Sequence, residues 1–163
     1  MNFGPVRCLI LACGNTLRGD DGVGPWLAAW ASERFRADDG VKVIASQQWT
    51  PELAEELAGT ESVLFIDCSV EAAPGSLRLI EVEPGGETPG FATHHLDASQ
   101  LLSLSKELYD AIPRAALLLT IGAGSLALRE GLSDAVQASL PDACGQLETA
   151  VLRMLADSGN QRA

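Results

Sequence analysis

The residues best suited to chemistry in this sequence are a few acidic and histidine side chains that follow short apolar runs. Asp20 and Asp21 stand in a glycine-rich segment after the first run, Asp67 ends a run of bulky apolar residues, and His94 and His95 are the two histidines of the chain. A carboxylate at the end of an apolar run loses hydration unless it is hydrogen-bonded or paired with a cation. Two carboxylates and one imidazole from three strand ends form an oxygen, oxygen, nitrogen set for a divalent metal with open positions.

Each of these residues also has a purely structural interpretation. One aspartate of the pair at 20 and 21 is sufficient to cap a helix, and Asp67 can cap a turn through backbone N–H groups. A histidine in a polar loop is more often a surface residue than a ligand. The choice between Asp20 and Asp21, and between His94 and His95, stays open at this level.

Other chemistries fit the sequence less well. Carboxylates at the start of a helix repel a pyrophosphate, so the glycine-rich segment does not predict a dinucleotide site, and no P-loop motif is present. There is no G-x-S-x-G nucleophile elbow. Cys68 and His94 form an alternative nucleophile and base, although only Asp67 is placed to orient the imidazole. Ser125 has no base near it in the sequence.

The elements that must position these residues alternate between strands and helices. Apolar runs bounded by turn residues, followed by stretches with helical spacing, are typical of an α/β fold with a mostly parallel, mixed sheet of about five strands. We expect Pro25 in the first turn of its helix, Thr50 and Ser133 as N-caps, a capping box at Asp97, and a kink or break at Pro141. We predict strands over 6–13, 41–46, 62–68, 76–83 and 114–121, and helices over 22–36, 52–58, 98–111 and from 134 to about 156.

Two of the expected strands, 62–68 and 76–83, are joined by a loop too short for a crossover helix. They should therefore pair antiparallel if they are neighbours. In such a sheet, functional side chains gather beyond the carboxyl ends of the strands, which is where Asp21, Asp67 and the histidines fall in the sequence.

Composition limits the class of protein. The 163 residues fit one domain, 1–163, and 47% of them are hydrophobic, which is enough for a substantial core. With 22 acidic and 11 basic residues the net charge is −11, which disfavours nucleic acid and anionic membranes as partners. No apolar run approaches the ~20 residues of a membrane span, so we expect a cytoplasmic protein. The four cysteines lack C-x-x-C spacing and should be reduced, mostly buried thiols.

Several of these segments together closely resemble the hydrogenase maturation endopeptidases, and the resemblance extends over essentially the whole chain. The segments are Gly14-Asn15-x-Leu17-x-Gly19-Asp20-Asp21-Gly22-x-Gly24, Ile66-Asp67 followed by Pro74-Gly75, Thr93-His94, and Gly131-Leu132-Ser133. The resemblance implies a three-layer α/β/α sandwich. It also implies an enzyme that cuts the C-terminal extension from the precursor of a nickel–iron hydrogenase large subunit.

By this similarity, Asp21, Asp67 and His94 contact the metal and carry catalysis, and Asp20 supports the site. The resemblance further implies that the metal is nickel already inserted in the precursor, and we expect no tightly bound organic cofactor. Two loops depart from the family pattern: 46–50 replaces an Asp-Gly-Gly-Thr-like stretch, and 122–125 lacks the usual proline. Both should lie on the substrate side of the sheet.

Two alternatives remain at this stage. One is a non-catalytic metallochaperone or adaptor of hydrogenase assembly, which would bind free divalent metal tightly. The other is a small-molecule hydrolase on the same fold, which would have an enclosed apolar pocket.

Overall fold

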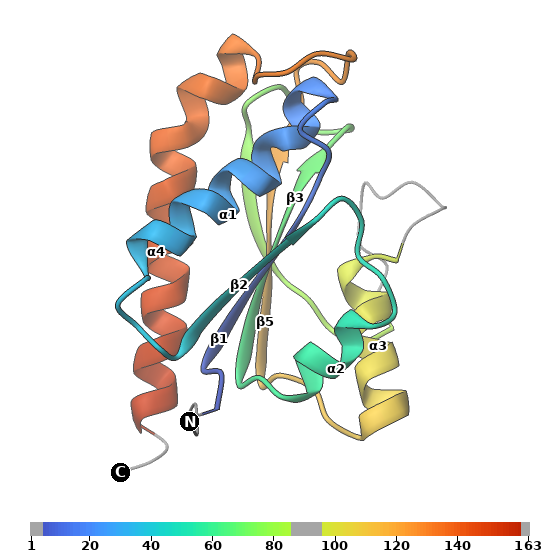
Figure 1. Ribbon diagram of the computed structural model, residues 1–163, viewed down its shortest axis with the longest axis vertical. Coiled ribbons are helices and arrows are strands. Elements are labelled where there is room, and N and C mark those ends of the chain that lie inside the picture. Colours follow the sequence, from blue (N-terminus) through green and yellow to red (C-terminus); the bar gives the residue numbers. More distant parts are fainter. Residues whose placement is uncertain (1–4, 86–95, 161–163) are drawn as a thin grey trace.

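The computed structural model describes residues 5–85 and 96–160, which form a five-stranded sheet between two layers of helices (Figure 1). The strands are β1 (Cys8–Cys13), β2 (Val41–Ser46), β3 (Ser62–Ser69), β4 (Leu77–Glu81) and β5 (Ala115–Gly122). The helices are the short 3₁₀ helix η1 (Gly19–Gly22), α1 (Val23–Arg34), α2 (Leu53–Ala58), α3 (Ala98–Tyr109) and α4 (Asp134–Asn160). The expected α/β sandwich is confirmed.

The sheet has the strand order β2-β1-β3-β5-β4. The first four strands in this order are parallel, and β4 runs antiparallel to β5 at the edge. The turn at Gly75 therefore does not make β3 and β4 neighbours, because β5 lies between them. An apolar central strand such as β3 needs backbone partners on both sides, and β1 and β5 supply them.

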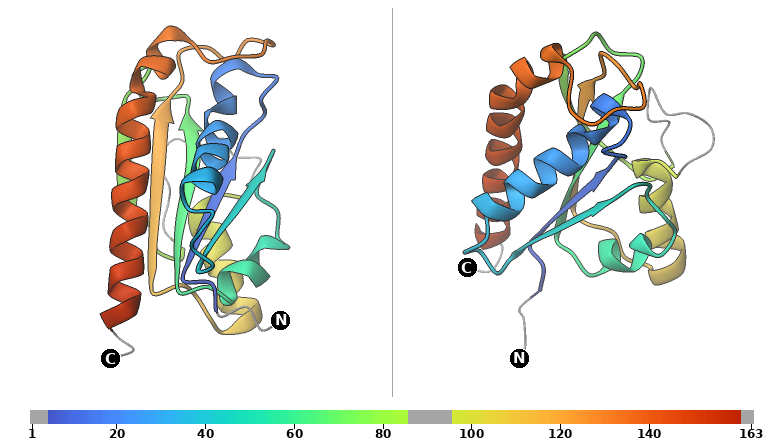
Figure 2. Two further views of the ribbon diagram at one scale, coloured as in Figure 1. Left: turned by 60° about the vertical axis from the view of Figure 1, so that its left-hand side comes forward. Right: turned by 45° about the horizontal axis from the view of Figure 1, so that its top comes forward.

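Side chains that alternate along β1 show how the two helical layers are separated. Cys8, Ile10 and Ala12 face one core, which is covered by α1 and α4. Leu9 and Leu11 face the other core, which contains residues of α2 and α3. Figure 2 shows these two layers on opposite sides of the sheet. Because β1 is covered on both faces, all of its residues are buried, as its continuous apolar run predicts.

The helix starts that were predicted from contacts within one helical turn are largely confirmed. Asp97 accepts a hydrogen bond from the Gln100 N–H at 2.8 Å, and the Gln100 side chain accepts from the Asp97 N–H at 2.9 Å, which is the expected capping box of α3. The Ser133 hydroxyl oxygen accepts from the Val136 N–H at 3.4 Å at the start of α4. Pro25 lies in the first turn of α1, where its missing N–H has no helical partner to lose.

Two helix-end predictions are wrong, and the break allowed for at Pro141 does not occur. The N-cap position of α2 is Glu52 rather than Thr50, and neither aspartate caps α1, whose N-cap is Gly22. The helix α4 is continuous through Pro141. Pro141 and Gln137 are both exposed, so the carbonyl that loses its helical partner can accept a hydrogen bond from water instead. No helix within the described ranges combines the length and the apolar character needed to cross a bilayer.

Candidate active site

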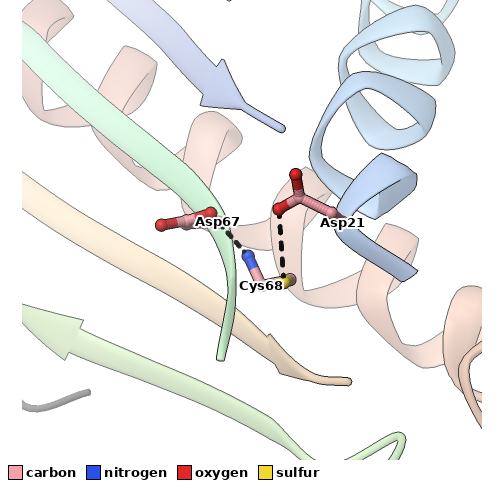
Figure 3. A group of neighbouring side chains, drawn as sticks. All are labelled: Asp21, Asp67 and Cys68. Atoms are coloured by element: carbon pink, nitrogen blue, oxygen red, sulfur yellow. Dashed lines mark hydrogen bonds between the residues drawn. The ribbon is translucent and has the colours of Figure 1, made fainter. Parts of the chain in front are cut away.

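A pocket of about 350 Å³ opens at the carboxyl ends of β1 and β3, where the sequence places its acidic residues. Asp21 reaches it from η1, and Asp67 and Cys68 reach it from the end of β3 (Figure 3). The other residues of its wall come from the end of β1, from the loops that follow β1, β2, β3 and β5, and from the segment before α3. They are Cys13, Gly14, Asn15, Arg18, Gln47, Gln48, Trp49, Val70, Leu96 and Leu126.

Asp67 is a nearly buried carboxylate with 9% of its surface exposed. Its Oδ1 atom accepts a hydrogen bond from the Cys68 N–H at 2.8 Å, and its side chain is hydrogen-bonded to the Cys13 thiol. Burial raises the pKa of Asp67 to about 7, the hydrogen bonds from Cys13 and Cys68 limit the rise, and the charge of Asp21 adds to it. Asp67 is thus held close to the pH at which it can either accept or give up a proton.

Asp21 is half-buried and is fixed at both oxygens. Its Oδ2 atom accepts from the Asn15 N–H at 2.8 Å, and its Oδ1 atom lies 3.6 Å from the Sγ atom of Cys68, whose thiol donates to it. The turn depends on Gly14, which has φ +150° and approaches the backbone of Asp21 so closely that a Cβ atom there would overlap the Asp21 carbonyl oxygen. The glycine of the motif therefore allows the loop to carry Asp21 back over the end of β1.

Asp21, Asp67 and Cys68 can each offer one ligand atom such that the three atoms lie within 4.8 Å of one another. These two oxygens and one sulfur form the cluster seen in Figure 3. Carboxylate and thiol groups at this spacing can surround a divalent cation and leave positions free for other ligands. The prediction that Asp21 and Asp67 meet in space is confirmed for these two residues.

Asp20 has a different environment, although it is the neighbour of Asp21 in sequence. It is fully buried, and its two oxygens accept four hydrogen bonds from the loop between β5 and α4. Burial opposes ionisation, but the hydrogen bonds from Ser133, Ser125 and Gly124 outweigh it and lower the pKa of Asp20. Asp20 therefore ties two loops together beside the pocket and has no oxygen directed to a ligand there.

His94 and His95 lie outside the described residues. Leu96, which follows them in the chain, lines the pocket, and Asp97 begins α3 as its N-cap.

Sequence reasoning gave too little weight to Cys68 and did not single out Arg18. The alternation of β3 puts Cys68 on the opposite face from Asp67, with the core that α1 and α4 cover, and its thiol reaches Asp21 there. No spacing rule in the sequence reveals that contact. The loop after β2, which was expected on the substrate side, contributes Gln47, Gln48 and Trp49 to the pocket wall. Trp49 is buried and meets Phe65 edge to face, with ring centroids 5.2 Å apart.

Several solved hydrogenase maturation endopeptidases have a fold similar to that of this chain. The hydrogenase maturating endopeptidase HybD from Escherichia coli has a TM-score of 0.74 at 22% identity, over 90% of this chain and 93% of that chain. The [NiFe] hydrogenase maturation protease HybD from Thermococcus kodakarensis has a TM-score of 0.67 at 26% identity, over 88% of this chain and 98% of that chain.

The sequence comparisons agree with the fold. The hydrogenase 2 maturation protease of Escherichia coli is 26% identical over 158 residues, which are 94% of this chain and 93% of that protein. The family model HycI, described as hydrogenase maturation protease, matches residues 30–150. The chain belongs to the hydrogenase maturation protease family. It is therefore a peptidase with an endopeptidase role in hydrogenase maturation.

Proposed function

We propose that this enzyme removes the C-terminal extension of a nickel–iron hydrogenase large-subunit precursor and recognises the inserted nickel through Asp21, Asp67 and His94. The observation that carries the proposal is the meeting of Asp21 and Asp67 in one pocket, from elements 46 residues apart in sequence, with ligand atoms close enough to share a cation. The family to which the chain belongs supports the same reaction class.

The described ligand set favours a metal that arrives with the substrate. Two carboxylates and a protonated thiol make few strong contacts to a free ion, and burial with the charges of Asp67 and Asp21 raises the pKa of the Cys68 thiol. When the precursor supplies most of the ligands of the nickel, this pocket has to supply only the few that are left. Recognition then depends on how the folded precursor docks rather than on reading a long peptide sequence.

Asp67 is suited to contact a cation that arrives with the substrate. In the free enzyme its pKa of about 7 leaves a large share of the carboxylate ionised near neutral pH, and a divalent cation nearby favours the ionised form further. Asp21, whose oxygens are oriented by Asn15 and Cys68, is suited to a fixed contact with the metal. His94 supplies the nitrogen ligand of the proposal.

Mass spectrometry of a co-expressed, nickel-loaded precursor tests this function. The unchanged enzyme should shorten the precursor at its C-terminus, and Asp21→Asn, Asp67→Asn and His94→Ala should each abolish or greatly reduce shortening. His95→Ala is the matched control and should keep most of the activity. A precursor of unchanged mass, with tight binding of free nickel, would indicate a metal-delivery protein instead. Undiminished cleavage by Asp21→Asn and His94→Ala would contradict the proposed metal contact.

A further inference from the structure

A hollow of about 220 Å³ lies beside the active-site pocket, at the start of α1. Trp26 and Pro25 of α1 and Leu132 before α4 supply its apolar wall, and no described residue that lines it is charged. A hollow of this kind suits an apolar side chain of a partner rather than an ion.

The loop between β1 and α1 separates this hollow from the pocket. Asn15, Arg18 and Asp21 line the pocket, whereas Thr16, Gly19 and Gly22 line the hollow. No described residue lines both, so the loop forms a ridge between them. A stable protein interface covers about 800 Å² on each partner, which is more than the mouth of such a pocket. A protein that places a peptide in the pocket therefore also covers the surface around it, and the ridge and the hollow adjoin the pocket on the side of α1.

Glycines keep this hollow open and its surroundings rigid. Apart from its chain neighbours, no atom lies within 4 Å of a Cβ added at Gly131, so this position opens onto the hollow. At Gly19 an added Cβ would lie 2.7 Å from the Ser125 carbonyl oxygen, so the two loops pack closely there. The hollow is thus formed before a partner arrives, and little loss of freedom opposes binding.

Three exposed apolar side chains belong to the segments around the hollow. Trp26 lines it and is still 41% exposed, while Leu17 and Leu128 are 55% and 86% exposed. The segments of the two leucines are joined by the isolated bridge between Arg18 and Arg129, and Figure 2 shows both segments beside the start of α1. We call the three side chains and the hollow the apolar rim. Exposed apolar side chains next to a functional pocket are typical of a surface that binds another protein.

The apolar rim lacks the acidic excess of the chain as a whole. The charged residues within 14–19 and 125–132 are Arg18, Arg129 and Glu130, a net charge of +1 against −11 for the chain. Few charges therefore lose hydration when an apolar surface covers these segments.

We propose that the apolar rim binds the folded part of the precursor that surrounds its nickel, and that the hollow takes an apolar side chain of that surface. This inference rests on the proposed function. The nickel is held by the folded precursor, so contact between the nickel and Asp21 and Asp67 brings the surrounding precursor surface onto the ridge and the hollow. Trp26 is the central contact, because it is an aromatic residue that forms the wall of a preformed hollow.

Processing kinetics test this role with Trp26→Ala, Trp26→Phe and Leu17→Gln, using the nickel-loaded precursor. Leu108→Gln is the matched control for Leu17→Gln: Leu108 is 59% exposed and lies in the last turn of α3, at the end of the sheet away from the pocket (Figure 1). Leu17 is on an exposed loop, so its variant keeps the test valid if Trp26→Ala does not fold.

Trp26→Ala should raise KM by about tenfold and change kcat by less than about twofold, since the rim binds the body of the precursor and not the reacting bond. Leu17→Gln should raise KM by roughly threefold, whereas Trp26→Phe and Leu108→Gln should stay near the unchanged enzyme. Unaltered KM in both Trp26→Ala and Leu17→Gln, or a loss of kcat alone, would overturn the inference.

A binding measurement separates this inference from the proposed function. The three tryptophans of the enzyme, Trp26, Trp30 and Trp49, can be replaced by 5-fluorotryptophan and observed by ¹⁹F NMR while unlabelled nickel-loaded precursor is added. The Asp67→Asn enzyme, which should not shorten the precursor, keeps the complex intact. The Trp26 signal, assigned by its loss in Trp26→Phe, should shift or broaden, while that of Trp30, which packs against the core beneath α1, should not.

Each outcome of this measurement decides the inference. If the unchanged enzyme shortens no precursor but the Trp26 signal moves, the proposed function fails and the docking role of the rim stands. A change at Trp49 in the pocket wall with no change at Trp26 would show a complex that leaves the rim uncovered, and would refute the inference. An enzyme dimer in sedimentation that Trp26→Ala dissolves, with KM unchanged, would make the rim a contact between two copies and would refute it as well.

Discussion

Asp20 and Ser133 are joined by two hydrogen bonds across 113 residues of sequence: the Ser133 N–H donates to Oδ1 at 2.6 Å, and the Ser133 hydroxyl donates to Oδ2 at 2.7 Å. Gly124 and Ser125 add N–H donors to Oδ2 at 2.7 and 2.9 Å. This buried carboxylate fastens the loop after β5 to the loop after β1. Both loops contribute to the pocket, so the Asp20–Ser133 pair controls its shape without facing into it.

Replacing Asp20 by asparagine should lower the free energy of unfolding by about 2–4 kcal/mol at neutral pH, because an amide cannot accept all four bonds. The pKa of Asp20 is lowered in the folded state from an ordinary value of 3.8, so its contribution is present above that pH and is lost as the pH falls through the folded pKa. Urea unfolding as a function of pH should therefore show the two proteins converging in acid. A difference that stays constant down to low pH would contradict this origin.

Asp67 should show the opposite pH dependence in the metal-free protein. Its pKa is raised from 3.8 to about 7, so its stabilising contribution is complete below pH 3.8 and is lost as the pH rises through 7. Asp67→Asn, which cannot ionise, should become more stable than the unchanged protein over this window, by an amount on the order of 4 kcal/mol at its upper end. Thermal unfolding at a series of pH values measures the crossover, and parallel curves for the two proteins would show that Asp67 titrates normally.

Gly14→Ala should destabilise the fold by about 3 kcal/mol or more, because the added Cβ meets backbone atoms of Asp21 at a positive φ. The displaced Asp21 should also reduce processing. Gly145→Ala in α4 is the matched control: apart from its chain neighbours and the nearby backbone of its own helix, no atom lies within 4 Å of its added Cβ, and alanine should stabilise the helix by about 0.5–1 kcal/mol. Chemical denaturation of both variants gives the comparison, and similar midpoints would remove the steric explanation.

Cys68→Ala should retain substantial processing activity. Burial and the charges of Asp67 and Asp21 raise the pKa of this thiol, so it is protonated at neutral pH and is a poor nucleophile. The loss of its contact with Asp21 should cost less than tenfold in kcat/KM, since a neutral thiol is a weak donor. Cys68→Ser, which keeps a donor, should be closer to the unchanged enzyme. Complete inactivity of both variants, with a covalent adduct at Cys68 in the unchanged enzyme, would instead support the cysteine–histidine alternative.

The elements of this fold follow closely from local sequence. The run that forms β1 is apolar at every position because both of its faces are covered, and the Asp97 capping box and Pro25 mark helix starts through contacts within one turn. These signals depend on residues near one another in the chain. The same is true of the glycine-rich loop, whose composition already predicts a tight turn that carries an aspartate.

The start of α2 and the continuity of α4 through Pro141 show where tertiary packing outweighs a local sequence signal. Thr50 has the right residue type for an N-cap, but α2 begins two residues further along, after turns that pack Trp49 onto Phe65. Pro141 stays inside α4 because the packed face of that helix extends on both sides of it, from Val136 to Leu155. Burial of a long apolar face can exceed the cost of one missing hydrogen bond.

The sequence by itself determined the strand and helix order, the family resemblance and the acidic residues of the site, because these depend on residue type and short spacing. Only the tertiary structure decided that β5 separates β3 from β4, that Asp20 binds Ser133 while Asp21 meets Cys68, and that Arg18 lies beside Arg129. Asp20 and Asp21 have the same side chain. They differ because the backbone turn places Asp20 among buried N–H and O–H donors and places Asp21 at the open ends of two strands.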